Sequence, residues 1–334
     1  MAVNRTELDL GVYAPHLVSP GVGVWRYERK LPLETDGRLR LLALGNGAAF
    51  STRMYQSNFI LVKGRTALFV DLGTKGTLKM AEFGLSVHDV RDVLITHSHA
   101  DHCGSVEELA LKARYEAPFI REPAKEPDEA QSLYLARIVA ARNSGKFRPN
   151  LYVPHGYAQQ LWGWTLRGGL AFGEETDIGG NRGEMLAGHF FNVVTPAKLD
   201  GFGVDTWVQD IGGIRVQSFR TKHIPDTSPS VDESMYSVGL VVDGRLYISG
   251  DTRFDASTTI RFGTGCELLL HDCQSFPGGV HAFYGNLLKG VPGDLRSRML
   301  LYHLDDGMAS RAEQAVKDGF KGLLEPAPVA YDFA

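Results

Sequence analysis

The stretch "LITHSHADHCGS" at residues 94–105 places three histidines and one aspartate within six positions, directly after a run of apolar residues. Imidazole nitrogens and carboxylate oxygens are both common ligands of zinc, at about 2.0–2.2 Å. Side chains two positions apart at the end of a strand can reach one ion, and the pair that follows on the turn can face a second ion. The candidate ligands are His97, His99, Asp101 and His102.

This motif requires further ligands elsewhere in the chain, and the second half offers three. His223 ends the apolar run "IRVQSFRTKH", Asp251 follows "YISG", and His303 ends "RMLLYH". In a two-layered sandwich of sheets, the loops after such strands gather along one edge. We therefore expect these three residues to lie beside the first motif.

The apolar runs predict two similar halves, each made of strands and helices. Short β-branched runs ended by Gly, Asp or Asn predict the strands. They cover residues 38–47, 57–64, 66–73, 90–97, 213–223, 236–244, 245–251, 266–272 and 298–303. Helices are expected at 74–85, 127–146 and about 308–319. Together they indicate a two-layered sheet sandwich flanked by helices.

The chain of 334 residues, 43% of them hydrophobic, is expected to form one domain. Residues 1–36 are interpreted as an N-terminal extension. The stretch of about 118–205 interrupts the rhythm of the strands, and we expect an insertion that serves as a lid or an oligomer contact.

Composition limits the partners and the compartment. A net charge of −4 gives no general attraction to nucleic acid. Three cysteines without a Cys-x-x-Cys pair argue for a reducing compartment. Neither a signal-peptide pattern nor an apolar stretch of about 18 residues is evident. We therefore expect a cytoplasmic protein that does not bind membranes.

Taken in order, four motifs resemble those of the metallo-β-lactamase superfamily: "THSHADH", the histidine of "KHIPDTSPS", "SGDT" and the histidine of "LLYHLDDG". The resemblance runs from about residue 38 to the end. It implies an α/β protein with an αββα sandwich, in which helices flank two mixed β-sheets. It also implies two divalent ions, zinc by default, with manganese or iron as alternatives.

The resemblance also assigns the ligands. One ion takes His97, His99 and His223, the other takes Asp101, His102 and His303, and Asp251 bridges both. Asp71, in "VDLG", is expected to orient a ligand histidine from outside the metal site.

Two further stretches indicate a branch of the superfamily. "LLALGNGAAFSTRMYQSNFILV" and "LLLHDCQSF" are similar to segments of the ribonuclease Z group, in which a histidine helps to protonate the leaving group. This resemblance nominates His271 as a catalytic residue, beside Asp101 as a residue that orients the nucleophile. The short segment between His223 and Asp251 leaves no room for the arm that clamps tRNA, so no large RNA is expected as a partner. The compact anti-Pycsar phosphodiesterases, which cleave cyclic nucleotides, resemble the chain better.

We therefore predict a metal-dependent hydrolase of a small phosphodiester such as a cyclic nucleotide. Two ions about 3.5–4 Å apart can clamp the attacking and leaving oxygens of such an ester. The same site would attack a carbonyl, so hydrolysis of a lactone, thioester or related carboxyl ester is the alternative. A metal-binding scaffold without activity is disfavoured, because all seven candidate ligands are present.

Side chains near the predicted ligands are candidates for binding the substrate. Cationic groups can neutralise a phosphate. The candidates are Arg220, Lys222, Arg253 and His281. By resemblance to the compact relatives, a homodimer is expected.

Overall fold

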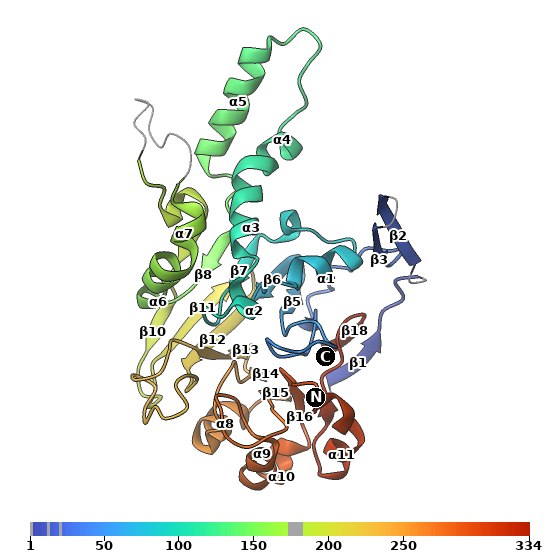
Figure 1. The fold of residues 1–334 in the computed structure, drawn as a ribbon, viewed down its shortest axis with the longest axis vertical. Helices are drawn as coiled ribbons and strands as arrows, with labels where there is room; N and C mark the ends of the chain where they lie inside the picture. The colour runs from blue at the N-terminus through green and yellow to red at the C-terminus, as the bar shows by residue number, and fades with distance from the viewer. Residues whose placement is uncertain (1–2, 12–13, 20–21, 173–182) are drawn as a thin grey trace.

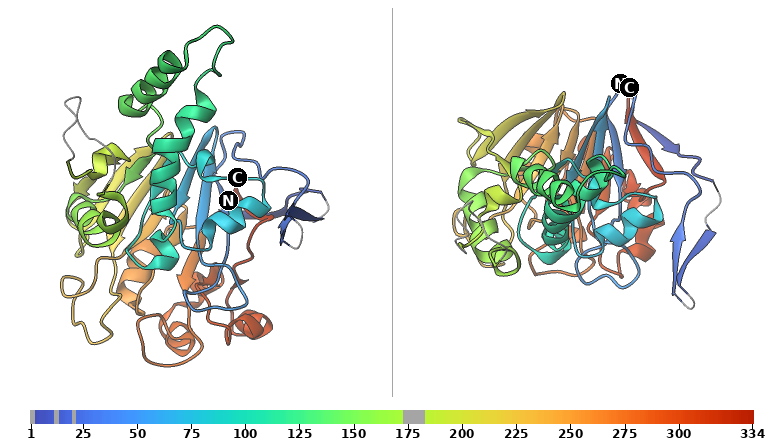
Figure 2. Two further views of the ribbon diagram at one scale, coloured as in Figure 1. Left: turned by 45° about the horizontal axis from the view of Figure 1, so that its top comes forward. Right: turned by 90° about the horizontal axis from the view of Figure 1, so that it is seen from above.

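Two eight-stranded sheets lie face to face, and helices cover the outer face of each (Figure 1). The structure is a computed structural model that describes residues 3–11, 14–19, 22–172 and 183–334. Seen from above, the sheets form the two inner layers, and the chain termini lie close together (Figure 2). This architecture confirms the predicted αββα sandwich of mixed sheets.

The first sheet has the order β1-β18-β4-β5-β6-β7-β8-β9. Its strands are antiparallel from β1 to β6 and parallel from β6 to β9. Their bounds are Val3–Glu7 (β1), Val329–Phe333 (β18), Arg40–Ala43 (β4), Phe59–Lys63 (β5), Thr66–Val70 (β6), Asp92–Leu94 (β7), Asn150–Tyr152 (β8) and Asn192–Val194 (β9).

The second sheet runs from β10 to β17 in sequence order and repeats this pattern. It is antiparallel from β10 to β14 and parallel from β14 to β17. The bounds are Ala197–Leu199 (β10), Thr206–Ile211 (β11), Ile214–Arg220 (β12), Val238–Val242 (β13), Leu246–Ile248 (β14), Leu268–Asp272 (β15), Met299–Tyr302 (β16) and Gly322–Leu323 (β17).

Helices cover the two outer faces because each presents apolar residues to its sheet. On the first sheet, residues such as Met80 and Leu109 join the outer core. The helical segments of this half are Gly76–Glu82 (α1), Val87–Asp89 (η1), Ala100–Cys103 (α2), Val106–Leu111 (α3), Lys112–Glu116 (η2), Ala117–Arg121 (α4), Gln131–Ser144 (α5), His155–Gln160 (α6), Leu161–Leu166 (η3), Arg167–Leu170 (α7) and Ala187–His189 (η4).

On the second sheet, Phe262 and Leu287 join the corresponding outer core. The helical segments are Ala256–Gly263 (α8), Tyr284–Gly290 (α9), Gly293–Arg296 (α10), Ala309–Arg311 (η5) and Ala312–Lys317 (α11). Between the sheets lies a third core, to which the first sheet contributes Leu61 and the second Leu240, both fully buried.

The two irregular stretches of the sequence contribute more to the sandwich than their patterns indicate. Residues 118–205 include β8 and β9 at the edge of the first sheet and β10 at the edge of the second. Within 1–36, β1 pairs with β18, and a separate hairpin joins β2 (Ala14–Ser19) and β3 (Val22–Arg26). What stands out from the body is α5, at the top of Figure 1. Residues 1–2, 12–13, 20–21 and 173–182, which fall within these two stretches, lie outside the described part.

None of the helices in the described part of the chain combines the length and the apolar character that a membrane crossing needs. The three cysteines are buried and unpaired.

The topology brings the ends of several strands to one edge. β12 and β14 are each antiparallel to β13, and β14, β15 and β16 are mutually parallel. These four strands therefore end on the same side of the second sheet. The loops that follow them face the loop after β7 of the first sheet, where the histidine motif lies.

Candidate metal centre

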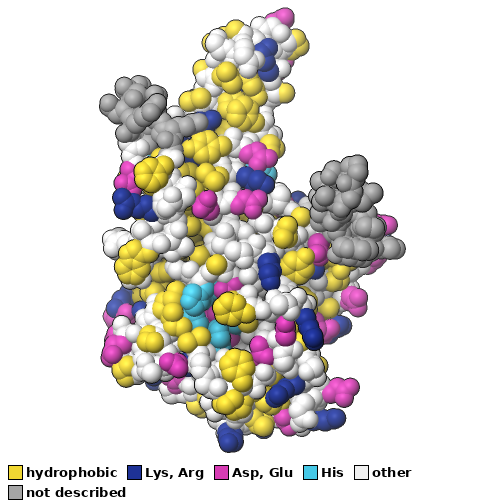
Figure 3. Space-filling model, viewed as in Figure 1, with side chains coloured by type: hydrophobic (Ala, Val, Ile, Leu, Met, Phe, Trp, Pro, Cys, Tyr) yellow, Lys and Arg dark blue, Asp and Glu magenta, His cyan; other side chains and the backbone are white. Residues whose placement is uncertain are grey.

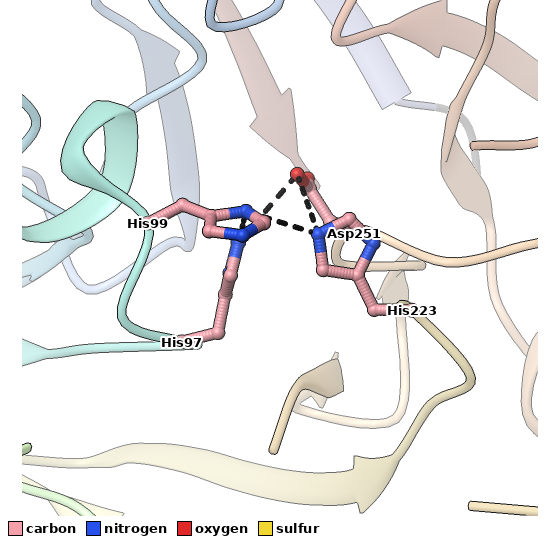
Figure 4. Close-up of side chains that lie close together, drawn as sticks. All are labelled: His97, His99, His223 and Asp251. Carbon is pink, nitrogen blue, oxygen red and sulfur yellow. Dashed lines mark hydrogen bonds and ion pairs between the residues drawn. The ribbon is translucent and has the colours of Figure 1, made fainter. Parts of the chain in front are cut away.

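The seven predicted ligands come together at this edge, in two groups that share Asp251. Within each group, one ligand atom from every residue lies within 4.8 Å of the others. The first group is His97, His99, His223 and Asp251, and the second is Asp101, His102, Asp251 and His303. Figure 4 shows the first group, with His97 and His99 converging on His223 and Asp251 from the opposite side.

One oxygen of Asp251 lies at the centre of both groups. Its Oδ2 is 3.2 Å from Nε2 of His102 and 3.2 Å from Nε2 of His303. The same atom is 3.7 Å from Nε2 of His97 and 3.9 Å from Nε2 of His223. A carboxylate in this position can contact an ion in either group.

Hydrogen bonds from outside the cluster orient three of the imidazoles. In each of them Nδ1 faces an outer partner, which leaves Nε2 directed at Asp251. The pairs are His97 with Thr96 Oγ1 at 3.1 Å, His102 with Asp71 Oδ2 at 2.7 Å, and His223 with the Val280 carbonyl at 3.2 Å. Such outer partners fix the tautomer of a ligand histidine and raise its basicity.

Asp71 is itself held in place. The backbone N–H of Thr96 donates to its Oδ1 at 2.7 Å, and the Thr96 hydroxyl donates to its Oδ2 at 2.8 Å. The backbone of Asp71 has a φ of 66°, and that of His303 has a φ of 54°. Both lie in the left-handed region, which is costly for residues other than glycine and tends to persist at functional sites.

The protonation states of the histidines and carboxylates in the cluster favour the binding of cations. Burial lowers the pKa of His223 and of His303 to about 4, so both are neutral at pH 7. Burial would raise the pKa of Asp101, but His102 outweighs it and lowers that pKa. Burial would also lower the pKa of His102, but Asp251, Asp101 and Asp71 raise it well above its usual value. The carboxylates thus favour positive charge at this position.

Several buried polar atoms of the cluster have no hydrogen-bond partner. An unsatisfied buried donor or acceptor costs about 1–3 kcal/mol. The atoms are Asp101 Oδ2, His102 Nε2, Asp251 Oδ1 and both ring nitrogens of His303. Divalent ions would satisfy these atoms except Nδ1 of His303, which lies on the other side of its ring, and a mixed imidazole and carboxylate set suits zinc as well as manganese or iron. The residues fit the two ions that the sequence implies.

His271, expected to act in catalysis, points away from the cluster. It is fully buried, its Nε2 lies 3.2 Å from Thr259 Oγ1 of α8, and its Nδ1 lies 3.1 Å from Asp272 Oδ1. The reason is the alternation of side chains along β15. Leu269 packs against the helices and Leu270 against the first sheet, so His271 faces the helices and Asp272 the cluster.

Asp272 and His281 form a pair beside the cluster instead. His281 Nδ1 is 3.0 Å from Asp272 Oδ2 and 4.0 Å from Asp251 Oδ2, and its ring centroid is 4.7 Å from that of His303. Burial would lower the pKa of His281, but its hydrogen bond to Asp272 raises it. The sequence nominated His281 but missed Asp272, although the alternation within "LLLHD" contained the signal.

The three cations expected to bind substrate have other partners. Arg220 donates to the carbonyls of Val231 and Ser234. Lys222 Nζ is 3.7 Å from Asp255 Oδ2. Arg253 donates to the carbonyls of two residues, Asp226 and Ser228. The two arginines thus support the loop that follows His223, and the structure does not bring them to the cluster.

An aromatic contact that the sequence did not reveal links α6 to the histidine motif. The hydroxyl groups of Tyr157 and Ser98 lie 2.9 Å apart. The Tyr157 ring stacks on Tyr236 at 4.3 Å, and the guanidinium of Arg220 lies 4.6 Å from the Tyr236 ring centre. Part of the 118–205 stretch therefore buttresses the loop that carries His97 and His99.

The cluster is not completely closed off from the surface. In the space-filling view, cyan histidine atoms emerge in the lower half of the molecule, bordered by hydrophobic side chains (Figure 3). His99 is the partly exposed member of the first group.

Comparison with known proteins agrees with this picture. A sequence-family model described as "Anti-Pycsar protein Apyc1" matches residues 39–124 and 135–329. The anti-Pycsar protein Apyc1 of Paenibacillus sp. (strain J14) is 27% identical over 275 residues, which cover 81% of this chain and 91% of that protein. The protein of the same name from Bacillus phage 010DV004 is 28% identical over 274 residues, 81% of this chain and 90% of its own length.

Among solved structures, the metallo-beta-lactamase fold protein YhfI from Bacillus subtilis superimposes with a TM-score of 0.59 at 14% identity. The match covers 89% of this chain and all of YhfI. The likeness shows that the sandwich has the metallo-β-lactamase fold.

We expect Asp71→Asn to weaken zinc binding by about 10- to 100-fold, the usual effect of removing an outer partner of a ligand histidine. Asparagine tolerates the positive φ at this position, so the backbone is preserved. Competition with a chromophoric chelator measures the affinity. The matched control is Asp210→Asn, which changes an exposed carboxylate on β11. Unchanged zinc affinity in the Asp71 variant would contradict the role assigned to this residue.

Proposed function

Because the chain belongs to the anti-Pycsar protein Apyc1 family, we propose that it hydrolyses a small phosphodiester, that of a cyclic nucleotide, with two divalent metal ions. The observation that carries the proposal is the pair of ligand groups that share Asp251. Two adjacent cation sites suit a substrate whose reacting centre is anionic, because both can face the same phosphoryl group.

The two groups divide the ligands between the ions. His97, His99 and His223 would hold one ion, Asp101, His102 and His303 the other, and Asp251 both. Ions bound there would supply Lewis-acid activation of water and neutralise charge on the phosphoryl group. We propose zinc as the metal, with manganese or iron as alternatives that the same donor set accommodates.

The chain's own residues would orient the water and supply the proton. The lowered pKa of Asp101 keeps its carboxylate ionised, so it acts only as a hydrogen-bond acceptor. In this state it would orient the attacking water. Hydrolysis of a cyclic nucleotide expels an alkoxide, which needs a proton as it departs. His281 is held through Nδ1 by Asp272, and its other ring nitrogen would carry that proton. In this proposal His281 takes the role that the sequence pattern gave to His271.

We further propose that α5 forms a subunit contact in a homodimer. This helix projects from the body (Figure 1) and exposes the apolar side chains of Leu133, Leu135 and Val139. Leu135 and Val139 are four positions apart and therefore lie on one face. The protruding part of the 118–205 stretch would then act between subunits, while Tyr157 supports the site within each subunit.

Metal content and a substrate panel test the central proposal. We expect about two equivalents of metal per chain and cleavage of a cyclic nucleotide and of bis-p-nitrophenyl phosphate, with no turnover of a lactone, thioester or β-lactam. Asp251→Ala should lose the most activity of any single ligand variant, because its carboxylate faces both groups, whereas Asp210→Ala should retain it. Lactone turnover without phosphodiester cleavage, under saturating zinc and then manganese, would overturn the proposal.

The leaving group distinguishes the two histidines near β15. We expect His281→Gln to lower kcat for a cyclic nucleotide by about 10²- to 10⁴-fold, the usual contribution of general acid catalysis. The p-nitrophenyl ester should be nearly unaffected, because its leaving group needs no proton. His271→Gln is the comparison; because His271 Nδ1 lies 3.1 Å from Asp272 Oδ1 and can affect His281 only indirectly, its loss should lower kcat for the cyclic nucleotide by less than His281→Gln does. Equal losses on both substrates for His281→Gln would remove this residue from the acid role.

The proposed subunit contact predicts a change of mass in solution. We expect the wild-type protein to sediment as a dimer at tens of micromolar, and Leu135→Glu with Val139→Glu to give a monomer. Two charges on the apolar face would have to be buried without partners in the dimer. The control is Val316→Glu, which changes another exposed apolar residue, on α11. A wild-type monomer would contradict the contact.

A further inference from the structure

Two exposed phenylalanines stand on loops beside the metal centre. Phe50 is 95% exposed and Phe276 is 53% exposed. A single exposed apolar residue is common on protein surfaces and needs no explanation. Here, however, two adjacent residues, Asp305 and Asp306, fix both loops to the segment that begins with His303.

The loop that carries Phe50 is bound on both sides of this residue. The backbone N–H of Ala48 donates to the Leu304 carbonyl at 2.9 Å, next to His303. The Ser51 hydroxyl donates to Asp306 Oδ1 at 2.6 Å. These bonds leave the tip of the loop little freedom, so its side chain stays exposed on a fixed backbone.

The loop that carries Phe276 is fixed in the same way. The backbone N–H and the hydroxyl of Ser275 donate to Asp305 at 2.6 and 2.8 Å. Farther along this loop, the Val280 carbonyl accepts from His223, at 3.2 Å from its Nδ1. Phe276 therefore belongs to a loop that also contacts the first ligand group.

An aromatic ring that a fixed loop holds in water does not gain the free energy that burying its apolar surface would give. A flat partner that covers the ring provides this free energy. A nucleobase is such a partner, and stacking on aromatic side chains is a general means of binding bases. In a cyclic nucleotide, the base is joined through the ribose to the phosphodiester that the metal centre would hold.

We propose that Phe50 and Phe276 form a stacking site for the nucleobase of the substrate. The proposal rests on the proposed function, because it identifies what lies beside the phosphoryl group. Asp306 fixes the loop that carries Phe50, and Asp305 fixes the loop that carries Phe276. The site thereby binds the part of the substrate that does not react.

Steady-state kinetics on two matched substrates test the stacking site. One substrate is 3′,5′-cyclic AMP, and the other is ribose 3′,5′-cyclic phosphate, which contains the same ester without a base. We expect Phe50→Ala and Phe276→Ala each to raise KM for cyclic AMP by about tenfold with little change in kcat, as expected from base stacking. Their kcat/KM for the abasic substrate should stay at the wild-type value, and Phe50→Trp should retain the wild-type KM for cyclic AMP.

The matched control is Phe172→Ala. Phe172 is 92% exposed, but it follows α7, which η3 separates along the chain from α6 and Tyr157. This variant should behave as the wild type does on both substrates.

The outcomes separate the two proposals. If the wild type cleaves cyclic AMP and neither alanine variant changes its KM, the stacking site is wrong and the proposed function stands. Equal losses on both substrates would also overturn it, because the rings would then serve only to shape the loops. If the wild type cleaves neither substrate, the proposed function fails, and the stacking site fails with it.

Discussion

The fold depends on how one carboxylate is accommodated where the two sheets meet. Asp251 is buried, and a buried carboxylate is very costly unless cationic or hydrogen-bonding groups surround it. Its Oδ2 has five histidines within 4.0 Å, two from the motif after β7 and three from the loops that follow strands of the second sheet. The compensation therefore comes from both halves of the chain, and the edge of the sandwich is stable only when the two halves are correctly opposed.

This requirement explains the constraints around the cluster. Thr96 holds the carboxylate of Asp71, which is also hydrogen-bonded to His102. Tyr157 is hydrogen-bonded to Ser98, which lies between the candidate ligands His97 and His99. Asp71 and Tyr157 lie outside the motif, so the motif alone does not fix its own geometry. The positive φ of Asp71 is maintained by these contacts, which hold its side chain between Thr96 and His102.

The sequence was sufficient to predict site residues that local motifs mark, and insufficient for those whose position depends on the path of a loop. The candidate ligands stand in a dense motif or at the end of an apolar strand, and both signals are visible along the chain. The partners of Arg220 lie on a loop eleven to fourteen residues away, and no periodicity predicts where that loop turns. Strands of three residues such as β8, β9 and β10 are too short to show an alternation.

The loop between Asp272 and His281 has to satisfy several contacts of the site at once. Gly278 and Gly279 both have a φ of 81°, a conformation that residues with a Cβ rarely adopt, so the chain can reverse and return His281 to Asp272. The same short loop presents Phe276 at the surface and the Val280 carbonyl to His223. A change in its path would therefore move a ligand's outer partner, the His281–Asp272 pair and an exposed ring together. For this reason, we regard the loop as a single unit that would couple the proposed metal binding, proton supply and substrate contact.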